Sequence, residues 1–410
     1  MASNAKNLAE LLNTDSTVAV GDIADGSVST AKLADDAVTN AKIGANAVGT
    51  TEIADDAVTS AKSDGSLGIG KNVIINGAMQ VAQRGTSSTG LGAANGYFTC
   101  DRYRHVFNGT AGRITSSQSS DAPAGFGKSL KFECTTADTS IAAGEYFFFS
   151  QKIEGQNLQH FAKGTSSAKA FAVSFYVKGN AAATYALELY DADNNRQCSK
   201  SFNVTTSWNR VELIFPADTT GAFTNDNGES LVLSWWLHAG TTFTSGTLNS
   251  SAFASNTNAN RALSTTSFFD STNRTFFITG IKLEPVQVTD YVHRSFDEEL
   301  RLCERYFYMT YPHGDTIGAA SGNSYLGRFL DGAHSYGSIQ VPHVNMRTAP
   351  TRVIYNTATG TQGSLRSDTN NHNAAITGTA AKGGGWIYAN GSSIGTSVSV
   401  KAHLTMDAEL

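Results

Sequence analysis

The chain has 410 residues, a formal net charge of −5 and a pI near 6.0, and this acidic balance argues against nucleic-acid binding. Charged residues make up only 16% of the chain, so its polarity comes mainly from Gly, Ser, Thr and Asn, which is typical of β-rich proteins with many turns. The sequence has no apolar run near 18 residues and no basic, apolar leader at its start, so we expect neither membrane insertion nor a signal peptide.

The first 22 residues contain a short apolar pattern. Leu8, Leu11 and Leu12 are spaced i, i+3, i+4, which places them on one face of a short helix. A helix of this length is not stable alone in water. The segment is therefore either a frayed terminus or an element that becomes ordered when it docks on a partner, and we favour the docking segment for residues 1–22.

Residues 23–62 form a decapeptide repeat, IADGSVSTAK, LADDAVTNAK, IGANAVGTTE, IADDAVTSAK. Its large apolar residues recur every five positions, whereas the remaining positions are mostly small or polar. Steps of five rotate by about 140° on an α-helix and alternate faces on a flat strand, so neither element gives one apolar stripe. The members of this stripe are Ile23, Val28, Leu33, Val38, Ile43, Val48, Ile53 and Val58.

A single chain with this pattern has nothing to pack against. Several parallel copies in register would direct each stripe residue to a common axis, with turns at the Asp, Asn and Gly positions. The alternative is a disordered linker, because polar repeats with few apolar residues also favour disorder. The unbroken register favours a thin fibre shaft over residues 23–71, which would reach at most about 130 Å if its 40 repeat residues were fully extended.

From residue 72 the sequence predicts a jelly-roll-like β-sandwich that extends to residue 294. All 40 aromatic residues lie after residue 96, where they are available to anchor a core. Phe171, Val173, Phe175 and Val177 alternate with other residues, as on one face of a strand. Many short apolar segments separated by turn clusters are typical of a sandwich. The segments that we expect to form strands are Asn72–Gly77, Ser129–Cys134, Ala170–Gly179, Tyr185–Asp191, Asn209–Ala217, Leu231–Gly240 and Arg274–Glu284.

One helix is expected between this sandwich and the end of the chain. Ser295 and Glu298 have the spacing of a capping box, and acidic residues fill the first turn. We therefore predict a linker helix over residues 295–307 that packs on the sandwich or on a neighbouring chain, with Phe296, Leu300, Cys303 and Phe307 as its apolar stripe. Residues 308–410 are rich in Gly, Ser, Thr and Asn with short apolar runs, which predicts a small C-terminal β domain at the tip.

The sequence contains no motif that predicts catalysis, a cofactor or a metal site. The GxSxG, P-loop and HExxH patterns are absent, and Cys100, Cys134, Cys198 and Cys303 have no CxxC spacing, so we expect four free, buried thiols. Asp191, Asp193 and Asn195 have the spacing of half a calcium loop, but the sixth position is not Gly and the twelfth is not Glu, which favours a solvated hairpin turn.

Trp235 and Trp236 are the candidate glycan contacts. They are adjacent, so in a strand one side chain points into the core and the other points outward. For the outward side chain we favour the core or a subunit interface over stacking on a sugar ring. The triplet Phe147–Phe149 allows the same alternatives. Arg102, Arg104 and His105 are more typical of ion pairing at a sheet edge than of a ligand site.

Three stretches together resemble a family of bacteriophage tail-fibre and virion appendage proteins, of the type found in phages of marine bacteria, including cyanobacteria. They are the decapeptide repeat, the segment NVIINGAMQVAQRGTS followed by DRYRH, and the segment GIKLEPVQVTDYVHRSFDEELRLCERYF. In the third segment the resemblance rests on Leu283, Glu284, Glu299, Leu300, Cys303, Arg305 and Tyr306. The later VNMRTAPT is also similar to the family. Val286 and Gln287 stand where the family usually has a Gly, so the local turn is expected to differ.

The resemblance implies a homotrimeric fibre with a carbohydrate-binding-like sandwich. The resulting hypothesis is a structural tail-fibre subunit, made in the host cytoplasm, that docks on other virion proteins through its N-terminus and attaches to a glycan or protein of the host surface. The alternatives are a virion appendage that binds no receptor and a glycan depolymerase. No motif encodes the identity of the receptor, and we expect no enzymatic activity.

Overall fold

The computed structural model describes Ile43 and residues 72–263, 265–322, 326–329, 336–340, 344–367, 371–372, 376–377, 380–381, 384–390 and 399–410. The chain divides into two units, Met1–Ile69 and Gly70–Leu410, and the description that follows concerns the second. The predicted docking residues Leu8, Leu11 and Leu12, and every member of the shaft stripe except Ile43, lie outside the described residues. Ile43 is 43% exposed in the single chain, and its contact with a trimer axis stays a prediction.

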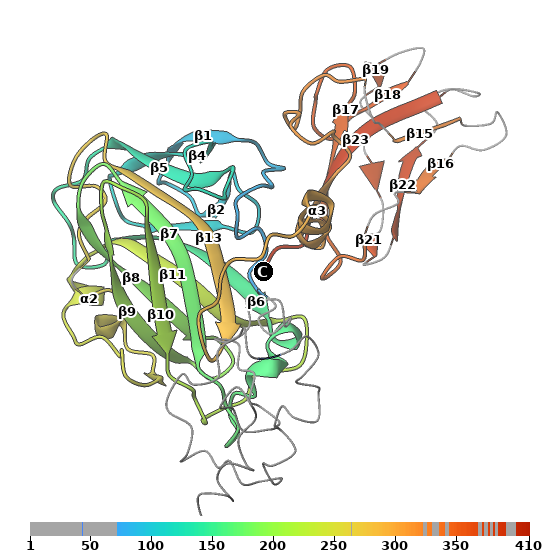
Figure 1. The fold of residues 1–410 in the computed structure, drawn as a ribbon. Coiled ribbons are helices and arrows are strands. Elements are labelled where there is room, and N and C mark those ends of the chain that lie inside the picture. The colour runs from blue at the N-terminus through green and yellow to red at the C-terminus, as the bar shows by residue number, and fades with distance from the viewer. Residues whose placement is uncertain are drawn as a thin grey trace, which may run out of the picture. The chain divides into compact units, whose positions relative to one another are not determined.

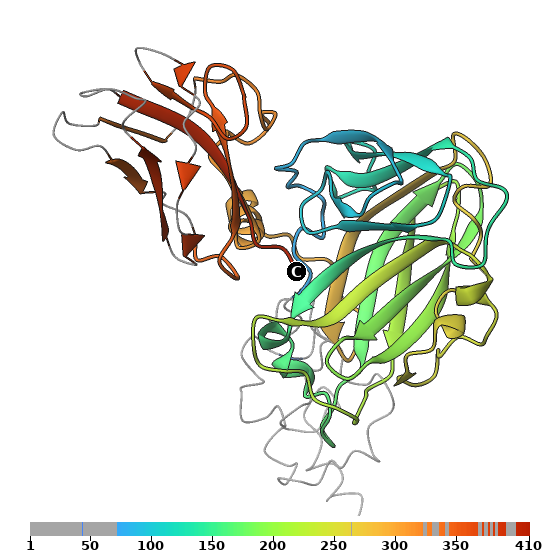
Figure 2. The ribbon, with the colours of Figure 1, turned by 180° about the vertical axis from the view of Figure 1, so that it is seen from behind.

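The predicted all-β sandwich is confirmed. Two antiparallel sheets pack face to face, and the chain crosses between them repeatedly, as in a jelly roll (Figures 1 and 2). In spatial order, the first sheet consists of β1 (Ser87–Leu91), β4 (Arg113–Ser119), β5 (Ser129–Thr136), β13 (Thr275–Pro285), β7 (Phe171–Gly179) and β10 (Asn209–Phe215). The second consists of β12 (Ala254–Ser255), β9 (Arg196–Val204), β8 (Ala183–Asp191), β11 (Glu229–Ala239), β6 (Tyr146–Glu154), β3 (Arg104–Asn108) and β2 (Gly96–Tyr97).

Aromatic and branched side chains from both sheets fill the space between them. The alternating Phe171, Val173, Phe175 and Val177 of β7 are all fully buried, as their spacing predicts. Short helical turns lie in the connections between strands: η4 (Gly155–Asn157) and η5 (Gln159–Phe161) follow β6, and α2 (Thr241–Thr244) and η6 (Asn258–Asn260) follow β11. In the part of the chain that the structure describes, no helix is long and apolar enough to cross a bilayer.

The prediction of a strand at Asn72–Gly77 is wrong, because this segment has no strand pairing. The Asn72 side chain makes the bonds that a neighbouring strand would make. Its amide donates to the Ile281 carbonyl at 3.0 Å, and its Oδ1 accepts from the backbone N–H of Ile74 and of Leu283, each at 3.0 Å. The segment is therefore held against β13 by the buried Asn72 side chain and by two isolated backbone bonds, from the Val73 N–H to the Leu283 carbonyl at 3.3 Å and from the Ile281 N–H to the Gly77 carbonyl at 3.0 Å, rather than by a regular ladder.

The predicted linker helix is confirmed as α3 (Phe296–Glu304), with the Ser295 hydroxyl accepting from the Glu298 N–H at 3.2 Å. Cys303 and Leu300 pack against Ile75 and Val81 of the sandwich. The predicted stripe is correct only in part, because the helix ends before Phe307, which begins a strand, and Phe296 is 39% exposed.

After α3 the chain forms further antiparallel sheets, in agreement with the predicted β structure of this region. In the first of them, β14 (Phe307–Met309), β15 (Leu326–Phe329), β17 (Thr351–Asn356) and β18 (Leu365–Ser367) all pair with the long strand β23 (Ser399–Asp407), and β19 (Asn371–His372) pairs with β18. In the second, β16 (Tyr336–Gln340), β20 (Ile376–Thr377) and β21 (Ala380–Ala381) pair with β22 (Gly384–Asn390).

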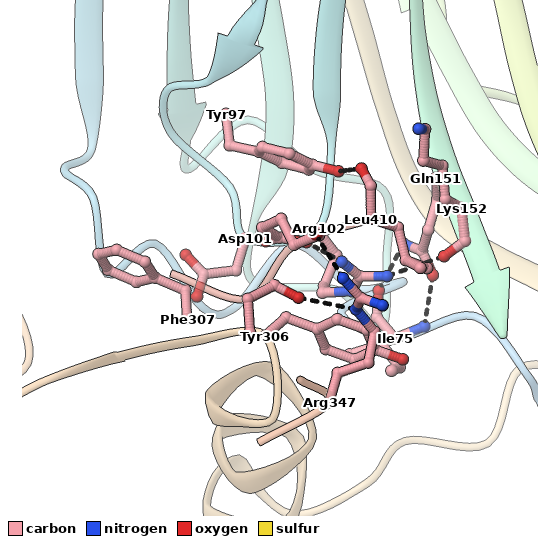
Figure 3. A network of polar contacts seen from close by, with 12 residues as sticks. Ile75, Tyr97, Asp101, Arg102, Gln151, Lys152, Tyr306, Phe307, Arg347 and Leu410 are labelled. Carbon is pink, nitrogen blue, oxygen red and sulfur yellow. Dashed lines mark hydrogen bonds and ion pairs between the residues drawn. The ribbon is translucent and has the colours of Figure 1, made fainter. Parts of the chain in front are cut away.

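A buried guanidinium joins the last residues of the chain to the sandwich. Arg102 is 1% exposed, forms an ion pair with Glu409 and donates to the Lys152 carbonyl at 2.8 Å. Its guanidinium carbon also lies 3.4 Å from the ring centre of Tyr306. Figure 3 shows this network, in which the Tyr97 hydroxyl also donates to the carbonyl of Leu410 at 3.2 Å.

A second buried charge, Glu154 at the end of β6, binds the residues that follow α3. Its carboxylate accepts from Arg305 Nε at 2.7 Å and Nη2 at 2.6 Å, and from the Tyr306 hydroxyl. Burial alone would raise the Glu154 pKa, but the bonds from Arg305 and Tyr306 outweigh it and lower the pKa. Glu154 therefore stays ionised at neutral pH and holds the end of the helix against the sheet.

The structure also shows where the cysteines, the proposed calcium-like turn and His105 lie. Cys100, Cys134, Cys198 and Cys303 are free and all buried, as expected. Asp193 and Asn195 lie in a hairpin turn between β8 and β9, as predicted, but Asp191 is the last residue of β8 and is not solvated, because its carboxylate is fully buried and pairs with Lys163. His105 is enclosed by Phe98 and Phe132, and burial lowers its pKa to about 3, so it is a neutral core residue.

Replacing Glu409 with Gln should destabilise the fold by about 3 kcal/mol, because it leaves the buried Arg102 charge without its counter-ion. Urea unfolding followed by circular dichroism measures this change. The matched control is Asp270→Asn, which breaks the more exposed pair with Arg274 and should cost less than about 1 kcal/mol. Equal effects of the two variants would contradict a structural role for the Arg102–Glu409 pair.

Candidate functional site

The tryptophan residues selected from the sequence do not form a surface site. Trp235 is fully buried between the sheets and stacks on Phe149, with ring centres 5.0 Å apart. Trp236 does point to the outer face of its sheet, but it is also fully buried. The prediction that either side chain contacts a glycan is therefore wrong, whereas a core position for both agrees with the alternative favoured above.

Trp236 is buried because other segments cover the outer face of the second sheet at this point. Phe148 and Phe243 lie with ring centres 4.7 and 5.3 Å from its own, and Ala262 closes the cluster. Its indole N–H donates to Glu188 at 3.0 Å, and Glu188 in turn forms an ion pair with Arg261. The segment that carries α2 and η6 therefore covers Trp236. The sequence of β11 alone does not predict this cover.

The outer face of the first sheet presents a partly exposed aromatic row instead. Lys131 on β5, Phe277 on β13 and Lys178 on β7 are direct cross-strand neighbours, and Trp208 precedes β10 at the same level. The Lys178 ammonium lies 5.1 Å from the Phe277 ring centre and 5.5 Å from that of Trp208. We call Lys131, Phe277, Lys178 and Trp208 the Trp208 row.

Two carboxylates accompany the Trp208 row. Asp121 accepts from the Trp208 indole N–H at 3.0 Å and forms an ion pair with Lys178, and Glu133 forms one with Lys131. The bond from Lys178 is the main cause of a lowered Asp121 pKa; burial opposes it, and the bond from Trp208 lowers the pKa further. Asp121 is 43% exposed at its side chain and Lys178 is 21% exposed, so both retain capacity to bond to a ligand.

A second group of aromatic rings continues the same face beyond the Trp208 row. Phe126 lies with its ring centre 5.4 Å from Tyr176, 5.1 Å from Tyr291 and 4.9 Å from His293. Gly280 is required beneath them, because its φ is +65° and a Cβ there would lie 2.8 Å from Phe126 and 2.9 Å from Tyr176. The segments 121–128 and 286–294 therefore pack on the face and border the Trp208 row.

This arrangement suits a ligand with both apolar and hydroxyl-bearing faces. An indole ring offers a flat apolar surface with one polar edge, and the C–H face of a pyranose ring packs on such a surface. The charged groups beside it can donate to and accept from sugar hydroxyls. Sequence reasoning missed Trp208, although a Trp in a polar turn, between TTS and the strand NRVELIF, signals exposure.

No protein-family model matches the sequence, and a comparison with curated proteins gives no match. Comparison with solved structures aligns about half of the chain with carbohydrate-binding modules. TmCBM61 in complex with β-1,4-galactotriose shares 13% identity over 52% of this chain and 99% of that chain, with a TM-score of 0.28. The CBM22-1 xylan-binding domain of Paenibacillus barcinonensis Xyn10C shares 11% over 54% and 98%, with a TM-score of 0.27. The family 11 module from Clostridium thermocellum, in complex with a β-1,3-1,4-mixed-linked tetrasaccharide, shares 12% over 50% and 98%, with a TM-score of 0.25.

Replacing Trp208 with Phe keeps an aromatic ring but removes the indole N–H that donates to Asp121. The Asp121 pKa should therefore rise toward the ordinary value of an aspartate, which carboxyl NMR titration measures residue by residue. Tyr190→Phe, which also removes a polar hydrogen from an aromatic side chain but on the other sheet, should leave the Asp121 pKa unchanged. An unchanged pKa in the Trp208 variant would show that the indole does not bond to Asp121 in solution.

Proposed function

We propose that this chain is a subunit of a bacteriophage tail fibre or a related virion appendage, and that its sandwich attaches to a host-surface glycan without cleaving it. The observation that carries the glycan-binding part is the Trp208 row, a partly exposed indole beside Lys178 and Asp121. The indole offers a stacking surface for a sugar ring, and Lys178 and Asp121 place charged groups at its edge.

The fibre part of the proposal is supported by the sequence of residues 23–71. The five-residue stripe requires several copies to bury it, and the resemblance to tail-fibre proteins suggests three. Three sandwiches on one shaft, with many shafts on one particle, would convert weak individual contacts into firm attachment, because each later contact forms at high effective concentration. The N-terminal leucines would dock the shaft on other virion proteins.

Trp208→Ala should weaken glycan binding by roughly tenfold or more, because it removes the stacking surface at the centre of the proposed site. The probe is an array of bacterial lipopolysaccharide and capsule oligosaccharides, followed by calorimetry on those that bind. Tyr190→Ala removes a half-buried ring from the other sheet and should bind as the unchanged protein does.

Two results would contradict this assignment. If Trp208→Ala binds the glycan as the unchanged protein does, the binding site lies elsewhere. The first alternative location is residues 308–410, which the sequence predicts to form the tip of the fibre. The appearance of new reducing ends or a loss of polymer viscosity would favour the depolymerase alternative.

The shaft predicts a mass near three times 43.3 kDa in multi-angle light scattering of the full chain. The double variant Val38→Asp, Val48→Asp should shift this mass toward that of a monomer, because charges would then meet at the common axis. Thr39→Asp with Thr50→Asp introduces the same charges beside the stripe and should leave the mass unchanged. A monomeric unchanged chain would favour the linker alternative for residues 23–71.

A further inference from the structure

Asp138, Glu145 and His238 converge at one end of the sandwich, away from the Trp208 row. One potential ligand atom from each side chain lies within 4.8 Å of the others. Asp138 follows β5 of the first sheet, Glu145 directly precedes β6 of the second, and His238 lies near the end of β11. The connection between β5 and β6, which joins the two sheets, therefore supplies two of the side chains, and β11, about 100 residues further along the chain, supplies the third.

His238 has an unsatisfied ring nitrogen that faces the two carboxylates. The residue is fully buried, and its Nδ1 lies 2.8 Å from the Ser267 hydroxyl. Nε2 has no hydrogen-bond partner among the described residues, and it lies 3.9 Å from Glu145 Oε2, too far for a hydrogen bond. Burial lowers the His238 pKa to about 4, so the imidazole is neutral. When Nδ1 donates to Ser267, a lone pair on Nε2 points into the cluster.

The two carboxylates are held in place by neutral donors. Asp138 Oδ2 accepts from the Thr110 hydroxyl and the Ala111 N–H, both at 2.8 Å, and Glu145 Oε2 accepts from the Ala142 N–H at 2.9 Å. Burial opposes ionisation of Asp138, but these bonds keep its pKa below the ordinary value. Within the described ranges, neither carboxylate forms an ion pair with Lys or Arg. The cluster thus combines two carboxylates and a neutral imidazole without a positive charge.

We infer that this cluster is a binding site for a divalent transition-metal ion, with Zn²⁺ as the best-fitting member of the class. Ligand atoms bound at about 2.0–2.2 Å to one ion lie up to about 4.2 Å apart. The 3.9 Å between His238 Nε2 and Glu145 Oε2 is within this limit, and the bound of 4.8 Å for the whole cluster exceeds it by less than about 1 Å, so the side chains close slightly when they bind an ion. An imidazole ligand favours Zn²⁺ and its neighbours over Ca²⁺, which prefers oxygen ligands alone. Ser267 occupies the orienting position behind the histidine that such sites require.

The role of such an ion is structural. It connects the segment after β5 in one sheet with β6 and β11 in the other, at an end of the sandwich where the loop 109–112 also packs. Gly109, with φ of +71°, allows this loop to approach Glu145, since a Cβ there would lie 3.3 Å from Glu145 Cγ. The metal therefore adds a crosslink between the sheets where the apolar core ends, and it should raise the unfolding temperature.

The test is calorimetric titration of the untagged full chain, first treated with EDTA and then exchanged into metal-free buffer at neutral pH. ZnCl₂ should bind at one ion per chain and raise the unfolding temperature, whereas CaCl₂ should bind at least ~10-fold more weakly. Co²⁺ in place of Zn²⁺ should give a visible absorption spectrum that reports its coordination by nitrogen and oxygen ligands.

Glu145→Gln is the decisive variant, because Glu145 is partly exposed and its replacement preserves shape, whereas a change at the buried His238 can unfold the chain. It should weaken Zn²⁺ binding by ~10-fold or more. Glu212→Gln, at an exposed position on β10 of the first sheet, is the matched control and should leave Zn²⁺ binding unchanged. The inference is overturned if the unchanged chain does not bind Zn²⁺, if Ca²⁺ binds more tightly, or if Glu145→Gln binds Zn²⁺ as the unchanged chain does.

Discussion

The burial of charge where the sandwich meets the last strand is the constraint on which much of this structure depends. Arg102 and Glu154 lie too deep to remain without counter-ions, and a buried unpaired charge costs several kcal/mol. Their partners, Glu409 and Arg305, are supplied by segments more than 150 residues further along the chain. The buried charges of the sandwich are therefore paired only when the residues that follow α3 and β23 are in place. This pairing agrees with the assignment of residues 70–410 to one unit.

The same constraint gives a physical meaning to two of the stretches that resemble tail-fibre proteins. Asn76, in the stretch NVIINGAMQVAQRGTS, donates its backbone N–H to Glu299, in the stretch that ends in LCERYF. Ile75 and Val81 of the former pack against Cys303 and Tyr306 of the latter. Arg305 adds the pair with Glu154. These two stretches therefore contact one another where the helix packs on the sandwich.

The sequence predicts the β-sandwich well because the apolar alternation of its strands reports burial directly, as in β7. It fails where one side chain substitutes for regular structure, as Asn72 does beside β13. It also fails where burial depends on a distant segment. Trp236 reads as outward-facing from its position in β11, and only the fold shows that α2 covers it. The end of α3 before Phe307 is likewise set by pairing with β23.

The candidate sites were harder to predict than the fold, for the same reason. Trp208, Lys178 and Asp121 come from a turn, a strand and a loop that only sheet pairing brings to one face. Asp138, Glu145 and His238 are separated by up to 100 residues and have no motif spacing. Local patterns report which residues are buried, whereas the convergence of polar groups depends on strand order, which periodicity alone does not encode.

The burial of all four cysteines has a practical consequence for chemical labelling. Each thiol is enclosed, and burial raises the pKa of Cys100, Cys134, Cys198 and Cys303, so few thiolates form near neutral pH and reagents have no access to them. A single cysteine introduced on the surface would then be the only reactive thiol among the described residues without removing any native one. A fluorophore or spin label at such a position would report ligand binding or distances between copies in otherwise unchanged protein.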